Sequence, residues 1–377
     1  MVIGLSAYLL HRGSDYRAAG VSTYVRQLLT HLPRVRPDCS YTAFHGADAD
    51  ATPGVRSVVS PLPTYKPLVR IAWEQLGLPI QVLRSGVDVV HGTVNVLPLL
   101  TSKPTVLTVH DLSFMRHPER FPMGRSRYLR MAVARSVRCA DRVIAVSAHT
   151  RNDVVELLGL PTGRVSVVYS GVDASFRPLP ASELAAVRKD LVQGRAYILH
   201  VGTLEPRKNL DILIRAFAAV RERLKLEHVL ALVGARGWMY EELFQLVSEL
   251  GLGDEVRFVD YVDPQRLPLW YNCADLFVYP SAYEGFGLPV LEAMACGVPT
   301  VTSASSGLQE LAGSACLTVD PGSQESLEVA IARGLQDSQL HETLRKAGIE
   351  RARHFSWDET ARATVSVYEQ ALLESGN

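Results

Sequence analysis

The sequence contains little cysteine and no long apolar run, and both absences narrow what the protein can be. Its five cysteines form neither a C-x-x-C motif nor the ligand spacing of a zinc site, and they are Cys39, Cys139, Cys273, Cys296 and Cys316. We therefore expect no disulfide and interpret them as small buried hydrophobes in a reducing compartment. No uninterrupted apolar run reaches the roughly 18 to 20 residues of a membrane span. The N-terminus lacks the basic lead of a signal peptide, so a cytoplasmic location is expected.

An excess of charge of either sign is also missing. Thirty-nine basic side chains balance thirty-nine acidic ones, so bulk electrostatics does not indicate a nucleic-acid partner. A length of 377 residues with 47% hydrophobic residues is enough for two domains, each with its own core.

The first half of the chain alternates short apolar runs with helical periods. Strands are expected at 1–10, 87–91, 105–109, 143–147 and 165–169, and helices at 21–32, 123–139 and 149–158. Buried β-branched strands separated by helices predict a parallel sheet covered on both faces. Ligands of such sheets bind at the carboxyl ends of the strands.

The second half repeats this alternation. Strands are expected at 197–201, 229–233, 256–259, 276–279 and 300–302, and helices at 210–224, 241–250 and 357–373. The proline-bearing stretch 176–180 between the halves has no helical period, and we place the domain boundary there. The predicted domains are 1–173 and 174–356.

Polar residues follow two of the strands of the first half. His110 and Asp111 come directly after the strand at 105–109, and Ser147 ends the strand at 143–147. A lone histidine is usually packed or solvated, whereas a His-Asp pair at a strand exit is a better candidate for a site.

The segment between the expected strand 197–201 and the expected helix 210–224 carries two cations. Asn209 is a natural N-cap for the helix that follows, and Arg207 and Lys208 come just before it. Cations at a helix start oppose the helix dipole, which favours a functional role over a structural one. Prearranged Arg and Lys donors stabilise the negative charge that develops on a leaving diphosphate.

The most informative stretch runs from Glu284 to Pro299. Pro289 suits a first helical position, and Gly297 suits a left-handed position after the helix end, so a helix of two to three turns is expected. Glycines before a helix N-terminus let backbone amides approach an anion such as a diphosphate. Glu284 outside the helix and Glu292 within it could each bind sugar hydroxyls. The alternative is a solvated Glu284 and a buried helix in which Glu292 pairs with an arginine.

This stretch resembles the signature of family 4 glycosyltransferases, whose motif places two glutamates with seven residues between them. The segment 19–25 is similar to the family's N-terminal glycine loop, and the likeness extends from Gly20 to Trp357. The resemblance implies the α/β fold called GT-B, with two Rossmann-like parallel-sheet domains facing a central cleft and a last helix, about 357–377, that rejoins the first domain. It also implies sugar transfer with retention of configuration, without a cofactor or a bound metal.

The resemblance assigns roles residue by residue. His110, Glu284, Arg207 and Lys208 are the expected catalytic residues. The donor-binding residues are Gly20, Gly202, Arg207, Lys208, Phe286, Gly287, Leu288 and Glu292, and the acceptor-side candidates are Tyr24, Asp111 and Ser147. The family commonly has an arginine directly after the strand-end glycine, whereas this sequence has Thr203 there. The assignment is therefore firmer for Lys208 than for Arg207.

Two further stretches have alternative interpretations. Asp48-Ala49-Asp50 spells the metal-binding D-x-D of glycosyltransferases with another fold, but neighbouring Gly and Pro residues favour a solvated turn. The arginine-rich stretch Arg116–Arg142 is either a solvated helix or a surface for anionic lipid headgroups or a lipid-diphosphate acceptor, which would place the protein on the inner membrane face.

The stretch 73–79 and the segments after His110 are similar to bacterial mannosyltransferases of polysaccharide assembly. We therefore expect a mannosyltransferase that uses GDP-mannose and a glycan or lipid-linked saccharide acceptor. The alternatives are a UDP-sugar donor, a non-hydrolysing sugar-nucleotide epimerase, or a non-catalytic nucleotide-sugar binding module.

Overall fold

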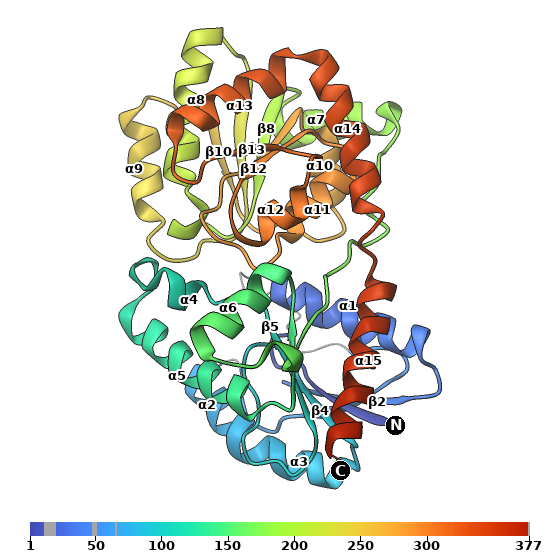
Figure 1. The fold of residues 1–377 in the computed structure, drawn as a ribbon. Helices are drawn as coiled ribbons and strands as arrows, with labels where there is room; N and C mark the ends of the chain where they lie inside the picture. The colour runs from blue at the N-terminus through green and yellow to red at the C-terminus, as the bar shows by residue number, and fades with distance from the viewer. Residues whose placement is uncertain (11–19, 47–50, 65, 376–377) are drawn as a thin grey trace. The chain divides into compact units, whose positions relative to one another are not determined.

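The computed structural model describes residues 1–10, 20–46, 51–64 and 66–375. The chain divides into two compact units (Figure 1). Unit 1 holds the described residues up to Gly171 together with those from Ser356 onward, and unit 2 runs from Val172 to Phe355. The first division lies two residues before the boundary expected at Asp173.

Within the described residues, unit 1 contains a seven-stranded parallel sheet with the strand order β3-β2-β1-β4-β5-β6-β7. Its strands are β1 (Val2–Ser6), β2 (Ser40–His45), β3 (Val55–Val59), β4 (Val89–Gly92), β5 (Thr105–Val109), β6 (Arg142–Ala145) and β7 (Val165–Val167). Every residue of β5 is buried, as its run of β-branched and apolar residues predicts. The sequence pattern did not identify β2 and β3, and β3 lies at the sheet edge with three of its five residues exposed.

The helices of unit 1 are α1 (Gly20–Val35), α2 (Pro67–Ala72), the π-helix η2 (Trp73–Gly77), α3 (Leu78–Ser85), α4 (Ser113–Arg116), the 3₁₀ helix η3 (Pro118–Arg120), α5 (Met123–Cys139), α6 (Ala148–Leu158), the 3₁₀ helix η4 (Thr162–Arg164) and α15 (Trp357–Ser375). In the described part of the chain, no helix combines the length and the apolar character that a bilayer crossing requires.

Unit 2 contains, among the described residues, a six-stranded parallel sheet with the strand order β10-β9-β8-β11-β12-β13. Its strands are β8 (Tyr197–Val201), β9 (Val229–Val233), β10 (Val256–Val259), β11 (Leu276–Tyr279), β12 (Thr300–Ser303) and β13 (Leu317–Val319). Its helices are α7 (Ala181–Val192), the 3₁₀ helix η5 (Pro206–Lys208), α8 (Leu210–Leu224), α9 (Glu241–Glu249), α10 (Leu267–Cys273), α11 (Leu288–Ala295), α12 (Ser306–Ala312), α13 (Gln324–Gln336) and α14 (Ser338–Ala352). The prediction of two α/β domains with parallel sheets is confirmed.

The strand order of unit 2 reverses direction at β8. The chain proceeds from β8 to β9 on one side and later returns to β11 on the other side of β8. In open α/β sheets, ligands bind outside the carboxyl ends of the strands at such a reversal. The two loops that leave this point follow β8 and β11, and they carry Arg207, Lys208 and Glu284.

The chain links the units twice, and the two linking segments run side by side. The amide of Val172 donates to the carbonyl of Phe355 at 3.1 Å. A Cβ at Gly171 would lie 2.2 Å from the backbone nitrogen of Trp357, so only glycine permits this approach.

Candidate functional site

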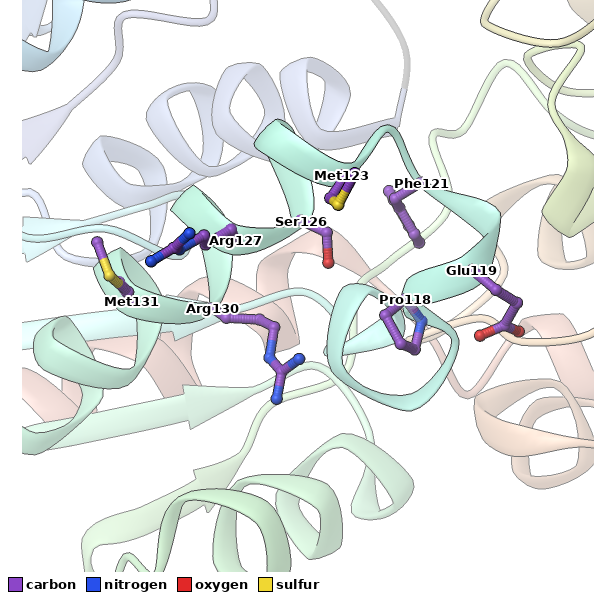
Figure 2. A pocket seen from close by; sticks show the side chains of 8 residues that line it. All are labelled: Pro118, Glu119, Phe121, Met123, Ser126, Arg127, Arg130 and Met131. Atoms are coloured by element: carbon purple, nitrogen blue, oxygen red, sulfur yellow. The ribbon is translucent and has the colours of Figure 1, made fainter.

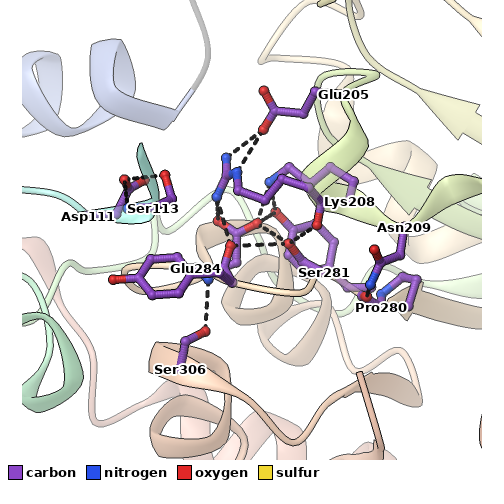
Figure 3. Close-up of polar contacts among 12 residues, drawn as sticks. Asp111, Ser113, Glu205, Lys208, Asn209, Pro280, Ser281, Glu284 and Ser306 are labelled. Atoms are coloured by element: carbon purple, nitrogen blue, oxygen red, sulfur yellow. Dashed lines mark hydrogen bonds and ion pairs between the residues drawn. The ribbon is translucent and has the colours of Figure 1, made fainter. Parts of the chain in front are cut away.

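The Glu284 carboxylate is the centre of a charged cluster in unit 2 (Figure 3). Its Oε1 accepts from the Lys208 ammonium at 2.5 Å, and its Oε2 accepts from the Arg207 guanidinium at 2.8 Å. The Ser281 hydroxyl donates to Oε1 at 2.7 Å and the Tyr279 hydroxyl donates to it at 3.2 Å. Glu284 and Lys208 are only 7% and 5% exposed, so these bonds form largely out of water.

The cluster holds its charges by mutual stabilisation. Burial alone would raise the pKa of Glu284, but the nearby charges of Arg207 and Lys208 overcome this effect and lower it to about 2. Burial and the neighbouring Arg207 lower the pKa of Lys208, while Glu284 acts in the opposite direction. The carboxylate therefore keeps two cations in place where the sheet reverses its strand order.

Glu205 holds Arg207 from the other side, and sequence reasoning did not assign it a role. Its Oε1 accepts from two guanidinium nitrogens of Arg207, at 3.0 Å from Nε and 2.6 Å from Nη2. The same guanidinium also donates to the carbonyl of Tyr283 at 2.9 Å. The sequence signal that could have indicated this pairing is a glutamate two residues before an arginine, in the loop that follows a strand.

Asn209 does not cap α8 in the predicted way. It occupies the N-cap position in a left-handed conformation with φ of 50°, and its side chain makes no capping bond. Its amide group donates instead to the carbonyl of Pro280, at 2.9 Å. Asn209 therefore ties the loop after β8 to the loop after β11.

The loop that carries Glu284 leads into α11, whose N-terminus has no side-chain cap. Gly287 adopts φ of 106°, a conformation that favours glycine, and Pro289 lies in the first turn as predicted. Beyond the helix end, Gly297 has the expected left-handed conformation with φ of 73°. The first-turn amides of α11 and the adjacent cations Arg207 and Lys208 make this edge of unit 2 suitable for an anion.

Two hydrogen bonds hold the Glu284 loop to the start of α12. The Ser306 hydroxyl accepts from the Glu284 amide at 2.8 Å, and the Gly307 amide donates to the Glu284 carbonyl at 3.0 Å. A Cβ at Gly307 would lie 2.2 Å from the Gly285 carbonyl oxygen, so a larger residue would push this loop away.

Glu292 lies within α11 and has a different environment. Its carboxylate accepts from the Tyr271 hydroxyl of α10 at 2.8 Å, which replaces the arginine pairing considered as the structural alternative. Burial raises the pKa of Glu292 to about 8, and Asp173 adds to this effect, although the bond from Tyr271 opposes it. The two glutamates of the motif therefore differ in charge near neutral pH.

This shift predicts a pH dependence of stability. Because the folded-state pKa of about 8 exceeds the ordinary value of 4.5, stability from Glu292 is full below pH 4.5 and is lost as pH rises towards 8. Glu292→Gln keeps an acceptor for Tyr271 and removes the titration. We expect its melting temperature to fall less than that of the native protein between pH 5 and 8, whereas the exposed control Glu249→Gln follows the native curve. Parallel curves for all three proteins would contradict the assignment.

In unit 1, His110 contacts Thr93, Asn95 and the predicted residue Tyr24. Its Nε2 donates to the carbonyl of Thr93 at 2.8 Å, and its amide donates to the Asn95 side chain at 2.8 Å. Burial lowers the pKa of His110, against the opposing effects of Thr93 and Asp111, so the ring is neutral near pH 7. The ring of Tyr24 meets the ring of His110 edge-on, with 4.8 Å between centroids.

Three acceptor-side candidates have structural partners within unit 1. Tyr24 is 1% exposed and its hydroxyl is hydrogen-bonded to that of Thr108 at 3.1 Å. Asp111 accepts from the amide and the hydroxyl of Ser113 at 3.0 and 2.7 Å. Ser147 is the N-cap of α6 and accepts from the amide of Thr150 at 3.0 Å.

The remaining predicted donor residues contribute mainly backbone. Gly20 is the first residue of α1, and the Gly202 amide continues the β8 ladder by donating to the Val233 carbonyl at 2.9 Å. Leu288 is the first residue of α11, and Phe286 is 6% exposed with its ring edge-on to Phe355. The structure thus brings Arg207, Lys208 and Glu284 together in unit 2, and His110 with Tyr24 in unit 1.

Among the residues that the structure describes, no group of three or more His, Cys, Asp or Glu side chains could hold a metal ion. Asp48 and Asp50 lie outside the described residues.

The chain is similar to known proteins in sequence and in fold. Residues 18–176 match the family model described as Glycosyltransferase Family 4, and residues 184–351 match Glycosyl transferases group 1. The chain is 32% identical to O-antigen chain mannosyltransferase B of Escherichia coli, over 94% of this chain and 97% of that protein. Sucrose-phosphate synthase from Thermosynechococcus elongatus has a similar fold, with a TM-score of 0.83 and 24% identity over 99% of both chains. HepE of Anabaena, solved in complex with UDP and glucose, has a TM-score of 0.78 and 22% identity over 98% of this chain and all of that chain.

Proposed function

Because this chain belongs to glycosyltransferase family 4 and has the GT-B fold, we propose that it transfers mannose from GDP-mannose to a glycan or lipid-linked saccharide acceptor. The observation that carries the proposal is the cluster of Arg207, Lys208 and Glu284 beside the start of α11. Mannose and a saccharide acceptor are supported by the similarity to the E. coli mannosyltransferase over nearly the whole chain.

In the proposed reaction, the acceptor hydroxyl attacks the anomeric carbon from the face that the diphosphate leaves. The bond to the diphosphate breaks, a new glycosidic bond forms, and a leaving-group oxygen takes the proton of the hydroxyl. Arg207 and Lys208 stabilise the negative charge that develops on the diphosphate. His110 contacts the donor sugar, and Glu292 binds the ribose hydroxyls.

The environment of Glu284 favours sugar binding over nucleophilic attack. A two-step displacement with retention would require a carboxylate that attacks the anomeric carbon. Among the described residues, Oε1 of Glu284 accepts three hydrogen bonds, whereas Oε2 accepts one, from Arg207. These bonds and the pKa of about 2 make the carboxylate a weak nucleophile, while Oε2 keeps a lone pair for a sugar hydroxyl. We therefore assign Glu284 to the sugar hydroxyls and to the positioning of the two cations.

The donor can be tested by thermal shift. A ligand present at 100 times its dissociation constant stabilises the folded state by about 2.7 kcal/mol. GDP-mannose and GDP should raise the melting temperature, whereas UDP-glucose at the same concentration should not, and GDP-mannose should then be consumed in the presence of acceptor. Stabilisation by UDP-sugars alone would show that the donor is a UDP-sugar. Consumption of the sugar nucleotide without acceptor would favour the epimerase.

Transfer is proposed to proceed without a bound metal, because Arg207 and Lys208 supply the positive charge at the diphosphate. Activity should therefore survive EDTA, measured as mannose incorporated into acceptor after dialysis against the chelator. Complete loss that Mn²⁺ restores would contradict this, and would direct attention to Asp48 and Asp50.

For a lipid-linked acceptor, we propose peripheral membrane contact through the stretch Arg116–Arg142. Both ends of this stretch are neutralised: Arg116 donates to Asp153 at 2.7 Å and to Glu156 at 2.5 Å, and Arg142 pairs with Glu374. The contact therefore belongs to the intervening helix α5.

A further inference from the structure

Helix α5 presents an arginine-rich face without acidic residues. The sequence of the helix contains five arginines and no Asp or Glu. Exposed side chains recur along it at helical spacing, and they are Met123, Arg127, Arg130, Met131, Arg135 and Arg138. Two of them are large and apolar: Met123 is 87% exposed and Met131 is 65% exposed. The exposed methionines and arginines together give this helix face both apolar and cationic character.

A groove of about 660 Å³ lies between α5 and the turn 118–121 (Figure 2). Its lining combines apolar side chains with two arginines, and the residues are Pro118, Glu119, Phe121, Met123, Ser126, Arg127, Arg130 and Met131. The Ser126 hydroxyl donates to the Phe114 carbonyl at 3.2 Å, so this hydroxyl is already bonded within the fold. The polar groups of the groove are therefore mainly cationic.

The charges of the groove lining are unbalanced. Across the described part of the chain, Arg127 and Arg130 make no ion pair with a carboxylate, whereas Glu119 lies 3.5 Å from His117 and 4.0 Å from Arg120. Two cations thus border an apolar groove, while its one carboxylate lies beside His117 and Arg120. This combination matches an amphiphile with an anionic headgroup and an aliphatic chain.

We propose that this groove binds a phospholipid of an anionic membrane surface, with the phosphate held by Arg127 and Arg130 and the acyl chain lying along Phe121, Met123 and Met131. The inference rests on the proposed membrane contact and goes further, because it assigns a bound lipid and its ligands. Stable membrane attachment takes two signals, such as an inserted apolar group and a basic patch, and this groove supplies both. A nucleic acid fits less well, since Phe121 is the one aromatic side chain in the lining that could stack on a base.

The test is sedimentation of the full chain with vesicles, without nucleotide sugar or acceptor. Binding to phosphatidylcholine vesicles that contain phosphatidylglycerol should exceed binding to pure phosphatidylcholine. Each arginine near an anionic surface contributes about fivefold, so Arg127→Gln with Arg130→Gln should weaken binding about 25-fold. The matched control, Arg26→Gln with Arg56→Gln, removes two exposed arginines elsewhere in unit 1 and should bind like the native protein.

A second pair of variants tests the apolar part. At high salt the charge contribution is screened, and the remaining binding should fall at least threefold in Met123→Ser with Met131→Ser. Circular dichroism should be native-like for all variants, because the changed side chains are exposed. Equal binding by the arginine variant and its control, or equal binding to neutral and anionic vesicles, would overturn the proposal. Since no substrate is present, these outcomes do not depend on whether the donor assignment is correct.

Discussion

Lys208→Ala is expected to slow sugar transfer by about a hundredfold or more, as the loss of a group that stabilises developing charge typically does. The Lys208 ammonium lies 2.5 Å from Glu284 and 2.6 Å from the Tyr279 hydroxyl, so its position is fixed before a donor binds. An ammonium group held in this way is proposed to stabilise the leaving diphosphate without having to move. The variant should also bind GDP more weakly, measured by calorimetry, because the same charge faces the diphosphate in the ground state.

The control for this variant is Lys189→Ala, which removes an exposed lysine of α7 in the same unit. It should keep native kinetics and native GDP affinity. Lys208→Ala also leaves Glu284 with one cation less in a buried site, so its melting temperature must be measured beside its activity. Native transfer rates in a folded Lys208→Ala protein would remove Lys208 from the site.

The second large effect separates the two glutamates of the motif. Glu292→Gln should weaken GDP-mannose and GDP alike, since both carry the ribose that Glu292 is proposed to bind. Because the pKa of Glu292 is about 8, its carboxyl group is largely protonated near pH 7. A hydrogen bond between neutral groups contributes about 0.5 to 1.5 kcal/mol, a loss that calorimetry can resolve.

Glu284→Gln should leave GDP affinity unchanged or increased, while transfer falls sharply. The substitution removes the charge that Arg207 and Lys208 neutralise, so both cations become available to the diphosphate. Without nucleotide, the variant should melt below the native protein, because buried Lys208 loses its counter-charge, whereas Arg207 keeps Glu205. GDP should then raise its melting temperature at least as much as it raises that of the native protein. Equal loss of GDP affinity in both glutamate variants would contradict this division of roles, and a trapped glycosyl-Glu284 adduct would replace it with a two-step displacement.

Local sequence signals predicted the helices and strands of this fold better than the contacts between residues that lie far apart in the sequence. The apolar run 105–109 and the helix 123–139 match β5 and α5 because burial and period are properties of the segments themselves. Strand β3 was missed because an edge strand with exposed residues lacks the apolar pattern that marks a central one.

In the candidate site, Arg207, Lys208 and Glu284 were predicted from charge, spacing and family resemblance. Their mutual bonds were not predicted, because residues 76 and 77 positions apart meet only through the order of β8 and β11 in the sheet. The bond from Tyr271 to Glu292 depends in the same way on how α10 meets α11. The raised pKa of Glu292 follows from burial, which no local pattern around that residue encodes.

The return of α15 to unit 1 constrains the order of folding during synthesis. This helix packs against α1, and its buried Tyr368 is hydrogen-bonded to His91 of β4 at 2.7 Å. Because a ribosome releases the chain from its N-terminal end, all of unit 2 has been made before this helix emerges. Unit 2 can therefore complete its fold first, while the nascent unit 1 keeps an uncovered surface over β4 that chaperones can recognise. A protein truncated after Phe355 would leave that surface permanently uncovered, and we expect it to aggregate.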